Sequence, residues 1–186
     1  MKRKIWVLWL ALLLTGCSTR ADAMDAALQL RSEVNKAQGY QFDATIEADY
    51  GDQTYTFGLN CASAPDGSMR FAVTSPESIR GISGKIYGDG GTILFDDVAL
   101  AFPVLPDGQL SPVSAPWIFI KTLQSGFMRS AGQDGELLRV IIDDNYEDNA
   151  FSAHIWLNSD NLPVCGEIYW QGRRILHITV ENFQIL

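Results

Sequence analysis

Alternation of apolar and polar residues constrains this chain most, because it recurs in short runs separated by turn residues over most of the length. Every second residue is apolar in residues 42–50, and again in residues 55–61 after Gly51-Asp52. A period of two puts successive side chains on opposite faces of a strand, so each run predicts a strand with one buried face. The tight turn between them predicts an antiparallel hairpin.

The same pattern continues to the C-terminus, interrupted by Gly, Asp, Asn and Pro at short intervals. The further predicted strands are residues 69–73, 82–87, 92–95, 98–102, 136–143, 150–157, 163–170 and 173–183. About ten strands joined mostly by short loops predict one large, strongly curved antiparallel sheet.

Two segments have a helical period instead. Residues 25–36 carry apolar side chains at three- and four-residue spacings, which predicts an amphipathic helix ending near Gly39. Residues 102–114 contain three prolines and predict a loop, and Pro116 then begins a very apolar helix over residues 117–128. Such a helix must be covered, so we expect both helices to lie across the concave face of the sheet. The fold class is mainly β with α (α+β).

The N-terminus has the order of a signal segment. Three basic residues, Lys2 to Lys4, precede an apolar run over residues 5–14, which is about half of what a helix needs to cross a bilayer. The following Leu14-Thr15-Gly16-Cys17 resembles the lipobox of bacterial lipoproteins, in which the cysteine thiol is diacylated, for example with palmitate, and the preceding peptide is removed. A secretory signal with an incidental cysteine is the alternative.

The lipobox reading divides the chain into a signal peptide (1–16), a lipid-anchored tether (17–24) and a single domain (25–186). It predicts a protein outside the cytoplasm, held at the cell membrane through Cys17. Ser18 also permits outer-membrane sorting in a two-membrane bacterium. Removal of the signal leaves 11 basic against 22 acidic residues, a formal charge of −11. Such a surface repels phosphate backbones, so no nucleic-acid partner is expected.

Two other cysteines remain, Cys61 and Cys165. In an exported protein they can pair as a disulfide or stay as buried apolar residues.

The order of helix, strands, Pro-rich loop, apolar helix and strands resembles the LolA/LolB family of lipoprotein-carrier proteins. Residues 73–76 (VTSP), 88–97 (GDGGTILFDD) and 178–183 (ITVENF) carry the local likeness, which spans about residues 25–186. Members of that family form an incomplete β-barrel closed by helices, with an apolar cavity that holds acyl chains. The anchor at Cys17 makes this chain more similar to a membrane-bound receptor, LolB-like, or to an anchored Gram-positive homologue than to a soluble shuttle.

The resemblance implies a hydrophobic cavity formed by two groups of residues. On the lid side are Trp117, Ile118, Phe119, Ile120, Leu123 and Phe127; on the wall side are Met69, Phe71, Ile82, Ile86, Phe95, Trp156 and Trp170. An alkyl chain taken up there would gain about 0.8 kcal/mol per buried methylene. Each of these side chains is equally compatible with an ordinary core. Arg70 either helps to close the lid, as an arginine of the shuttle does, or is a surface residue.

No motif points to catalysis, a metal or a cofactor. His154 and His177 lie in alternating runs without the short spacing of a zinc helix. Residues 143–148 are acidic enough to hold calcium, but they lack the glycine and terminal glutamate of an EF-hand.

The leading hypothesis is therefore a membrane-anchored lipoprotein that binds lipid or lipoprotein acyl chains in an apolar cavity, in envelope lipid handling. The alternative is a non-enzymatic partner protein that stabilises or positions another envelope protein, such as a wall hydrolase. An enzyme with a site that carries no motif is a third hypothesis. An empty apolar cavity beneath the helix that begins near Trp117 favours the first hypothesis, and a filled interior favours the second.

Overall fold

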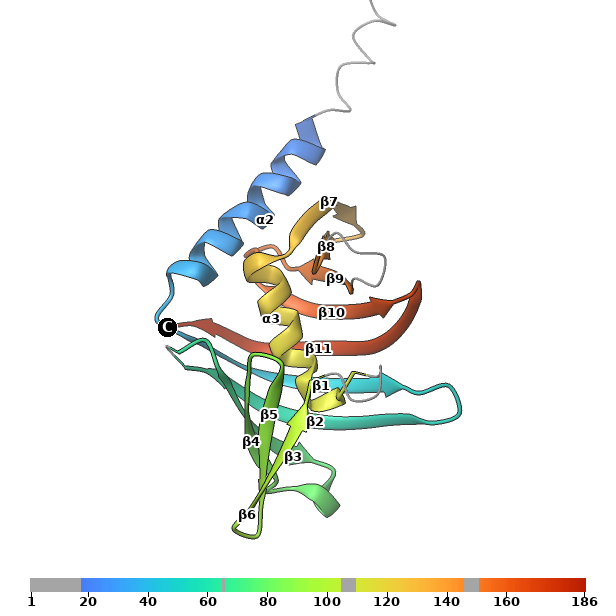
Figure 1. Ribbon diagram of the computed structural model, residues 1–186. Helices are drawn as coiled ribbons and strands as arrows, with labels where there is room; N and C mark the ends of the chain where they lie inside the picture. The colour runs from blue at the N-terminus through green and yellow to red at the C-terminus, as the bar shows by residue number, and fades with distance from the viewer. Residues whose placement is uncertain (1–17, 65, 105–109, 146–150) are drawn as a thin grey trace, which may run out of the picture.

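A computed structural model describes residues 18–64, 66–104, 110–145 and 151–186 (Figure 1). The predicted signal peptide and Cys17 lie outside the described residues. The described strands form one curved, unclosed antiparallel sheet of eleven strands, in the order β6-β5-β4-β3-β2-β1-β11-β10-β9-β8-β7. Helices α2 (Ser18–Lys36) and α3 (Ala115–Ser125) complete the fold. The predicted incomplete barrel of mainly β structure is confirmed.

All ten predicted runs are strands. The strands are β1 (Tyr40–Asp49), β2 (Thr54–Ser63), β3 (Met69–Ser75), β4 (Ser83–Tyr87), β5 (Gly90–Phe95), β6 (Val98–Pro103), β7 (Phe127–Asp134), β8 (Leu137–Asp143), β9 (Ser152–Leu157), β10 (Pro163–Trp170) and β11 (Arg173–Ile185). Within the described ranges, two single turns of 3-10 helix, η1 (Glu77–Ile79) and η3 (Pro112–Ser114), accompany them. The predicted hairpin is β1–β2, in which Phe42 faces Cys61 and Ala48 faces Tyr55.

The strand order explains the position of α3. Strands that follow each other in the chain are neighbours in the sheet, with the exception of β6 and β7. Because β1 pairs with β11, β6 and β7 lie at the two opposite edges of the sheet. The segment that joins β6 to β7 must therefore cross the sheet, and it does so as α3, over the concave face (Figure 1). The apolar composition of α3 suits this position, because eight of its eleven residues are buried.

The eleventh strand was not predicted. We expected helix as far as Met128, but α3 ends at Ser125 and β7 begins at Phe127. Gly126 lies at the change, and a Cβ atom there would meet Ile142 Cγ2 at 2.6 Å and the Asp143 carbonyl oxygen at 2.8 Å. The chain passes too close to β8 at this point for any larger residue to fit.

Helix α2 is longer than predicted, because it begins at Ser18 and so includes residues assigned to the tether. Its buried stripe is Ala23, Ala27, Leu30 and Val34, the spacing of one helical face. This face packs against β7 and the end of α3, and so covers one edge of the sheet. Among the described helices, none combines the length and the apolar composition that crossing a membrane would take.

Candidate functional site

The region directly beneath α3 is filled. Phe119, Ile120 and Leu123 are each 0–1% exposed. Phe119 lies on Gly166 of β10 so closely that a Cβ atom at Gly166 would overlap its ring. The wall residues Met69, Phe71 and Ile86 also belong to this buried core. An alkyl chain therefore has no room between the middle of α3 and the strands beneath it.

The other predicted cavity residues are dispersed. Ile82 is partly buried beside the core, whereas Phe95 and Phe127 are 52% and 40% exposed, at the β5–β6 turn and the start of β7. Trp156 lies between buried Ile155 and Leu157, so the period of two directs it to the convex face. There its indole Nε1 donates to Asp134 Oδ2 at 2.9 Å.

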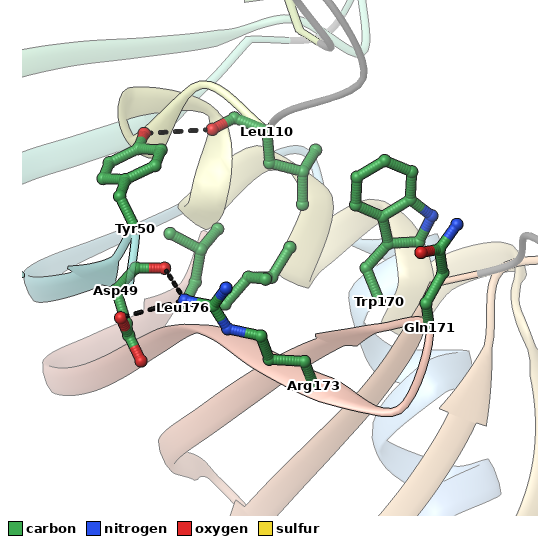
Figure 2. A pocket seen from close by; sticks show the side chains of 8 residues that line it. Asp49, Tyr50, Leu110, Trp170, Gln171, Arg173 and Leu176 are labelled. Atoms are coloured by element: carbon green, nitrogen blue, oxygen red, sulfur yellow. Dashed lines mark hydrogen bonds and ion pairs between the residues drawn. The ribbon is translucent and has the colours of Figure 1, made fainter. Parts of the chain in front are cut away.

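Trp170 borders an opening of about 390 Å³ near the N-terminal end of α3 (Figure 2). The opening is lined by Asp49, Tyr50, Leu110, Trp170, Gln171, Arg173, Ile175 and Leu176. Three of its polar side chains are already engaged. Arg173 Nη2 donates to Asp49 Oδ1 at 3.0 Å, and Tyr50 Oη donates to the Leu110 carbonyl oxygen at 3.3 Å. The apolar side is formed by Leu110, Trp170 and two residues of β11.

The charges at this opening are stable at neutral pH. The Gly51 backbone N–H and the Arg173 guanidinium lower the pKa of Asp49, so it stays ionised. Burial, followed by the neighbouring Tyr55, raises the pKa of Tyr50, so its hydroxyl stays a neutral donor. The ion pair and the hydrogen bond hold these polar groups in place, beside an apolar wall of similar extent.

A second opening, of about 280 Å³, lies beside α3. It is lined by Gly88, Asp89, Val104, Trp117, Ile118, Lys121, Asp144 and Phe151. The apolar groups come from α3, from the segment after β6 and from the residue before β9. The Lys121 ammonium lies 5.0 Å from the centre of the Trp117 ring. Asp89 and Asp144 line the same opening, so it carries charges of both signs.

The two openings are neighbours. Phe151 of the second and Trp170 of the first are in ring contact, with centroids 6.2 Å apart. Val104 and Leu110 border one opening each and flank residues 105–109, which lie outside the described residues. We use the name α3 rim for six of the apolar residues that border the openings: Val104, Leu110, Trp117, Ile118, Phe151 and Trp170.

Sequence reasoning identified three residues of the rim, Trp117, Ile118 and Trp170, and missed the other three. Val104 and Leu110 lie within the predicted Pro-rich loop, where the periods of strands and helices give no information. Phe151 was predicted as part of the strand over residues 150–157, whereas β9 begins at Ser152.

Cys61 and Cys165 are free thiols in the structure. They lie on β2 and β10, which are separated by β1 and β11, so they are roughly 14 Å or more apart at the usual strand spacing. Disulfides need Cα atoms within about 7 Å. The pairing considered from the sequence is therefore absent, and each cysteine is partly or fully buried instead.

The histidines do not meet. His154 packs against the Tyr169 ring at 4.5 Å between centroids, and His177 Nδ1 lies 3.7 Å from Glu167 Oε1. In the described part of the chain, no three His, Cys, Asp or Glu side chains are grouped as metal ligands. The acidic loop at residues 143–148 is described only as far as Asn145.

The unclosed sheet and the helix across its concave face form a half-barrel, the architecture predicted from the sequence. Similar solved structures include a DUF1329 family protein from Desulfovibrio piger (10% identity, 90% and 93% of the two chains covered, TM-score 0.49) and a LolA superfamily protein from Nitrosomonas europaea (10%, 88% and 93%, 0.47). A third is the CwlD amidase from Clostridioides difficile in complex with the GerS lipoprotein (12%, 88% and 95%, 0.46).

At these identities the likeness concerns the fold alone. No family model and no curated protein matches the chain.

Proposed function

We propose that this protein is a lipid-anchored, non-enzymatic protein of the bacterial cell envelope that binds the acyl chain of a lipid or lipoprotein at the α3 rim. The observation that carries the proposal is the pair of neighbouring openings that both have apolar walls, the first of them with an ion pair and a hydrogen bond already formed across it. Pockets for small ligands are mainly apolar and measure about 300–1,000 Å³, and the larger opening falls in this range.

The rim differs from the cavity first expected. A chain would lie at the N-terminal end of α3 and not beneath its middle, because Phe119 fills the space there. It would enter beside Lys121 and extend along Trp117 and Phe151 toward Trp170. The C-terminal end of the helix is held by α2.

The test is uptake of a fluorescent fatty acid by the secreted Cys17→Ser protein, in which no covalent lipid competes for the rim. Trp170→Ala should weaken uptake about tenfold, which corresponds to about 1.4 kcal/mol. Trp156→Ala is the matched control, because it removes a half-buried tryptophan from the convex face of the neighbouring strand. Saturable uptake that both variants retain equally would place the ligand elsewhere, and no uptake by folded protein would refute acyl binding.

A substitution in the middle of α3, such as Leu123→Asp, does not test binding. Leu123 is 1% exposed in the core, so a charge there would unfold the domain and not probe the site.

Membrane attachment is tested separately. Cys17→Ser should move the protein from the membrane fraction to the soluble fraction and abolish its labelling by radioactive palmitate. Attachment that persists without Cys17 would refute the lipid anchor.

A second function is favoured by the filled core under α3. If the rim takes up no chain, the protein acts as a partner of another envelope protein, such as a wall hydrolase. In that case a hydrolase should be recovered with the protein from solubilised envelopes, and Trp170→Ala should not change its recovery.

A further inference from the structure

Strand β6 forms an edge of the sheet, and no other described element covers it. Its six residues, Val98 to Pro103, carry no charge, and Val98 and Leu100 are 55% and 60% exposed. The opposite edge strand, β7, is packed against α2. Proteins usually protect edge strands with charges, bulges or a covering helix, because an open edge pairs with other strands. The covering helix α2 protects β7 in this way, whereas β6 has no charge, bulge or covering helix among the described residues.

The backbone of β6 has groups free to pair. Phe95 and Val98 flank a two-residue turn in which Asp96 and Asp97 both have positive φ, 46° and 64°. This geometry makes Phe95 and Val98 a hydrogen-bonded pair. Bonding directions alternate along a strand, so the N–H and C=O groups of Ala99 and Ala101 point away from β5.

The next bond along the chain agrees with this alternation. The Val104 N–H donates to the Asp89 carbonyl oxygen at 2.8 Å, so the even-numbered residues face β5. No bond to the outward groups of Ala99 or Ala101 is found within the described ranges.

The exposed apolar side chains of β6 continue the concave face beyond the cover of α3. Leu100 faces Ile93, Ile93 faces Gly84, and Gly84 faces buried Phe71 in one row across the strands. Because side chains alternate, Val98 and Phe102 share this face with Leu100. A strand added at the edge would therefore gain both backbone hydrogen bonds and apolar contacts.

We infer that β6 is an interface between two copies of this chain, which pair antiparallel about a two-fold axis at Leu100. In this register Ala99 of one copy exchanges two hydrogen bonds with Ala101 of the other, and the reverse pair adds two more. Leu100 faces the partner's Leu100 directly, and Val98 faces the partner's Phe102. The same patch serves both copies, as a two-fold interface requires.

The position of the charged residues favours a second copy of this chain as the partner of β6. Asp96 and Asp97 lie at one end of β6, so in the antiparallel register they lie beside the partner's uncharged Pro103 end, whereas a parallel pair would place them together. The same two acids at the hairpin tip oppose insertion among anionic head groups. A strand without charges is complementary to itself. The pairing does not involve the α3 rim, so its test does not depend on whether the rim binds acyl chains.

Cross-linking tests the register. Residues that face each other in a non-hydrogen-bonded antiparallel pair have Cα atoms about 4.5 Å apart, within the range for a disulfide. Oxidation of membranes that carry the full-length Leu100→Cys protein should therefore give a covalent dimer. Leu94→Cys is the matched control, since Leu94 is 48% exposed on the neighbouring strand but faces away from the axis. The unsubstituted protein controls for Cys61 and Cys165.

Two differently tagged copies of Leu100→Cys should be recovered in one cross-linked species. A product joined to another protein, or equal cross-linking by Leu94→Cys, would overturn the inference.

Sedimentation gives an independent measurement. The secreted Cys17→Ser protein should form dimers, and Leu100→Lys should shift it to monomer because like charges would meet at the axis, whereas Leu94→Lys should not. Raising salt from about 0.1 M to about 1 M should favour the dimer, since it screens the repulsion between two acidic chains. A monomer at all concentrations and salt conditions would also overturn the inference.

Discussion

The Arg31 Nε atom of α2 donates a hydrogen bond to the Leu123 carbonyl oxygen of α3 at 2.7 Å. Its Nη2 atom donates to the Gly126 carbonyl oxygen, also at 2.7 Å. The last carbonyl groups of a helix lack partners within the helix and carry partial negative charge, so a guanidinium there satisfies both needs. Burial lowers the pKa of Arg31, but an arginine remains charged at any ordinary pH. The contact fixes the C-terminal end of α3.

Loss of this contact should destabilise the domain. Arg31→Met keeps the aliphatic part of the side chain but leaves the two carbonyl groups without their charged donor, which should cost about 1–2 kcal/mol of unfolding free energy. Urea unfolding measures the difference. Arg70→Met, at an exposed strand position, is the control and should change stability by less than about 0.5 kcal/mol. Equal effects of the two substitutions would contradict a specific role for Arg31.

The contact between Phe119 and Gly166 should not tolerate a larger residue. Gly166→Ala places a methyl group where the Phe119 ring lies, so we expect a loss of about 1–3 kcal/mol through overpacking. Gly132→Ala is the control, since a Cβ atom there meets no atom within 4 Å. Thermal unfolding of both variants should show a lower midpoint for Gly166→Ala only. A neutral Gly166→Ala would mean that α3 does not pack closely on β10.

Stability should fall in acid partly through Asp43. The Asn182 side chain donates to this carboxylate at 2.8 Å and the Asn60 side chain at 2.9 Å, and these bonds hold its pKa below the ordinary value of 3.8. A lowered folded-state pKa contributes stability above the unfolded-state pKa, and this contribution is lost as the pH falls through the folded-state pKa.

Urea midpoints should therefore differ most between the unsubstituted protein and Asp43→Asn near pH 6, and the difference should shrink below about pH 3.8. A constant difference from pH 6 to pH 3 would show that the charge of Asp43 is not involved.

The two cysteines outside the lipobox should react as separate thiols. Burial raises the pKa of both, and Cys61 is fully buried whereas Cys165 is half-buried. In the Cys17→Ser protein, a thiol reagent should modify Cys165 first under native conditions and both cysteines in denaturant. Mass spectrometry without reductant counts the modified sites. Failure of the denatured protein to react would indicate a disulfide.

The elements that follow from local patterns were predictable. The alternation in residues 42–50 and 55–61 determined a hairpin and its register, because a shift by one residue would expose Phe42 and Ile46. The apolar character of residues 117–123 likewise required a covered helix. The end of that helix was not predictable, because it depends on the contact of Gly126 with β8, a strand that follows later in the chain.

The binding site depended on tertiary structure more than the strands did. An apolar residue on a strand or helix has the same pattern whether it borders a core, an opening or solvent, so Phe119, Trp170 and Phe95 could not be distinguished by sequence. The places of these three residues follow from the strand order. It puts Phe119 of α3 over Gly166 and Trp170 beside Leu110, and it leaves Phe95 beyond the cover of the helix. The sequence alone determined which segments become strands and helices, because each period is a local property. Only the folded chain decided which apolar surfaces meet, because those contacts join residues far apart in sequence.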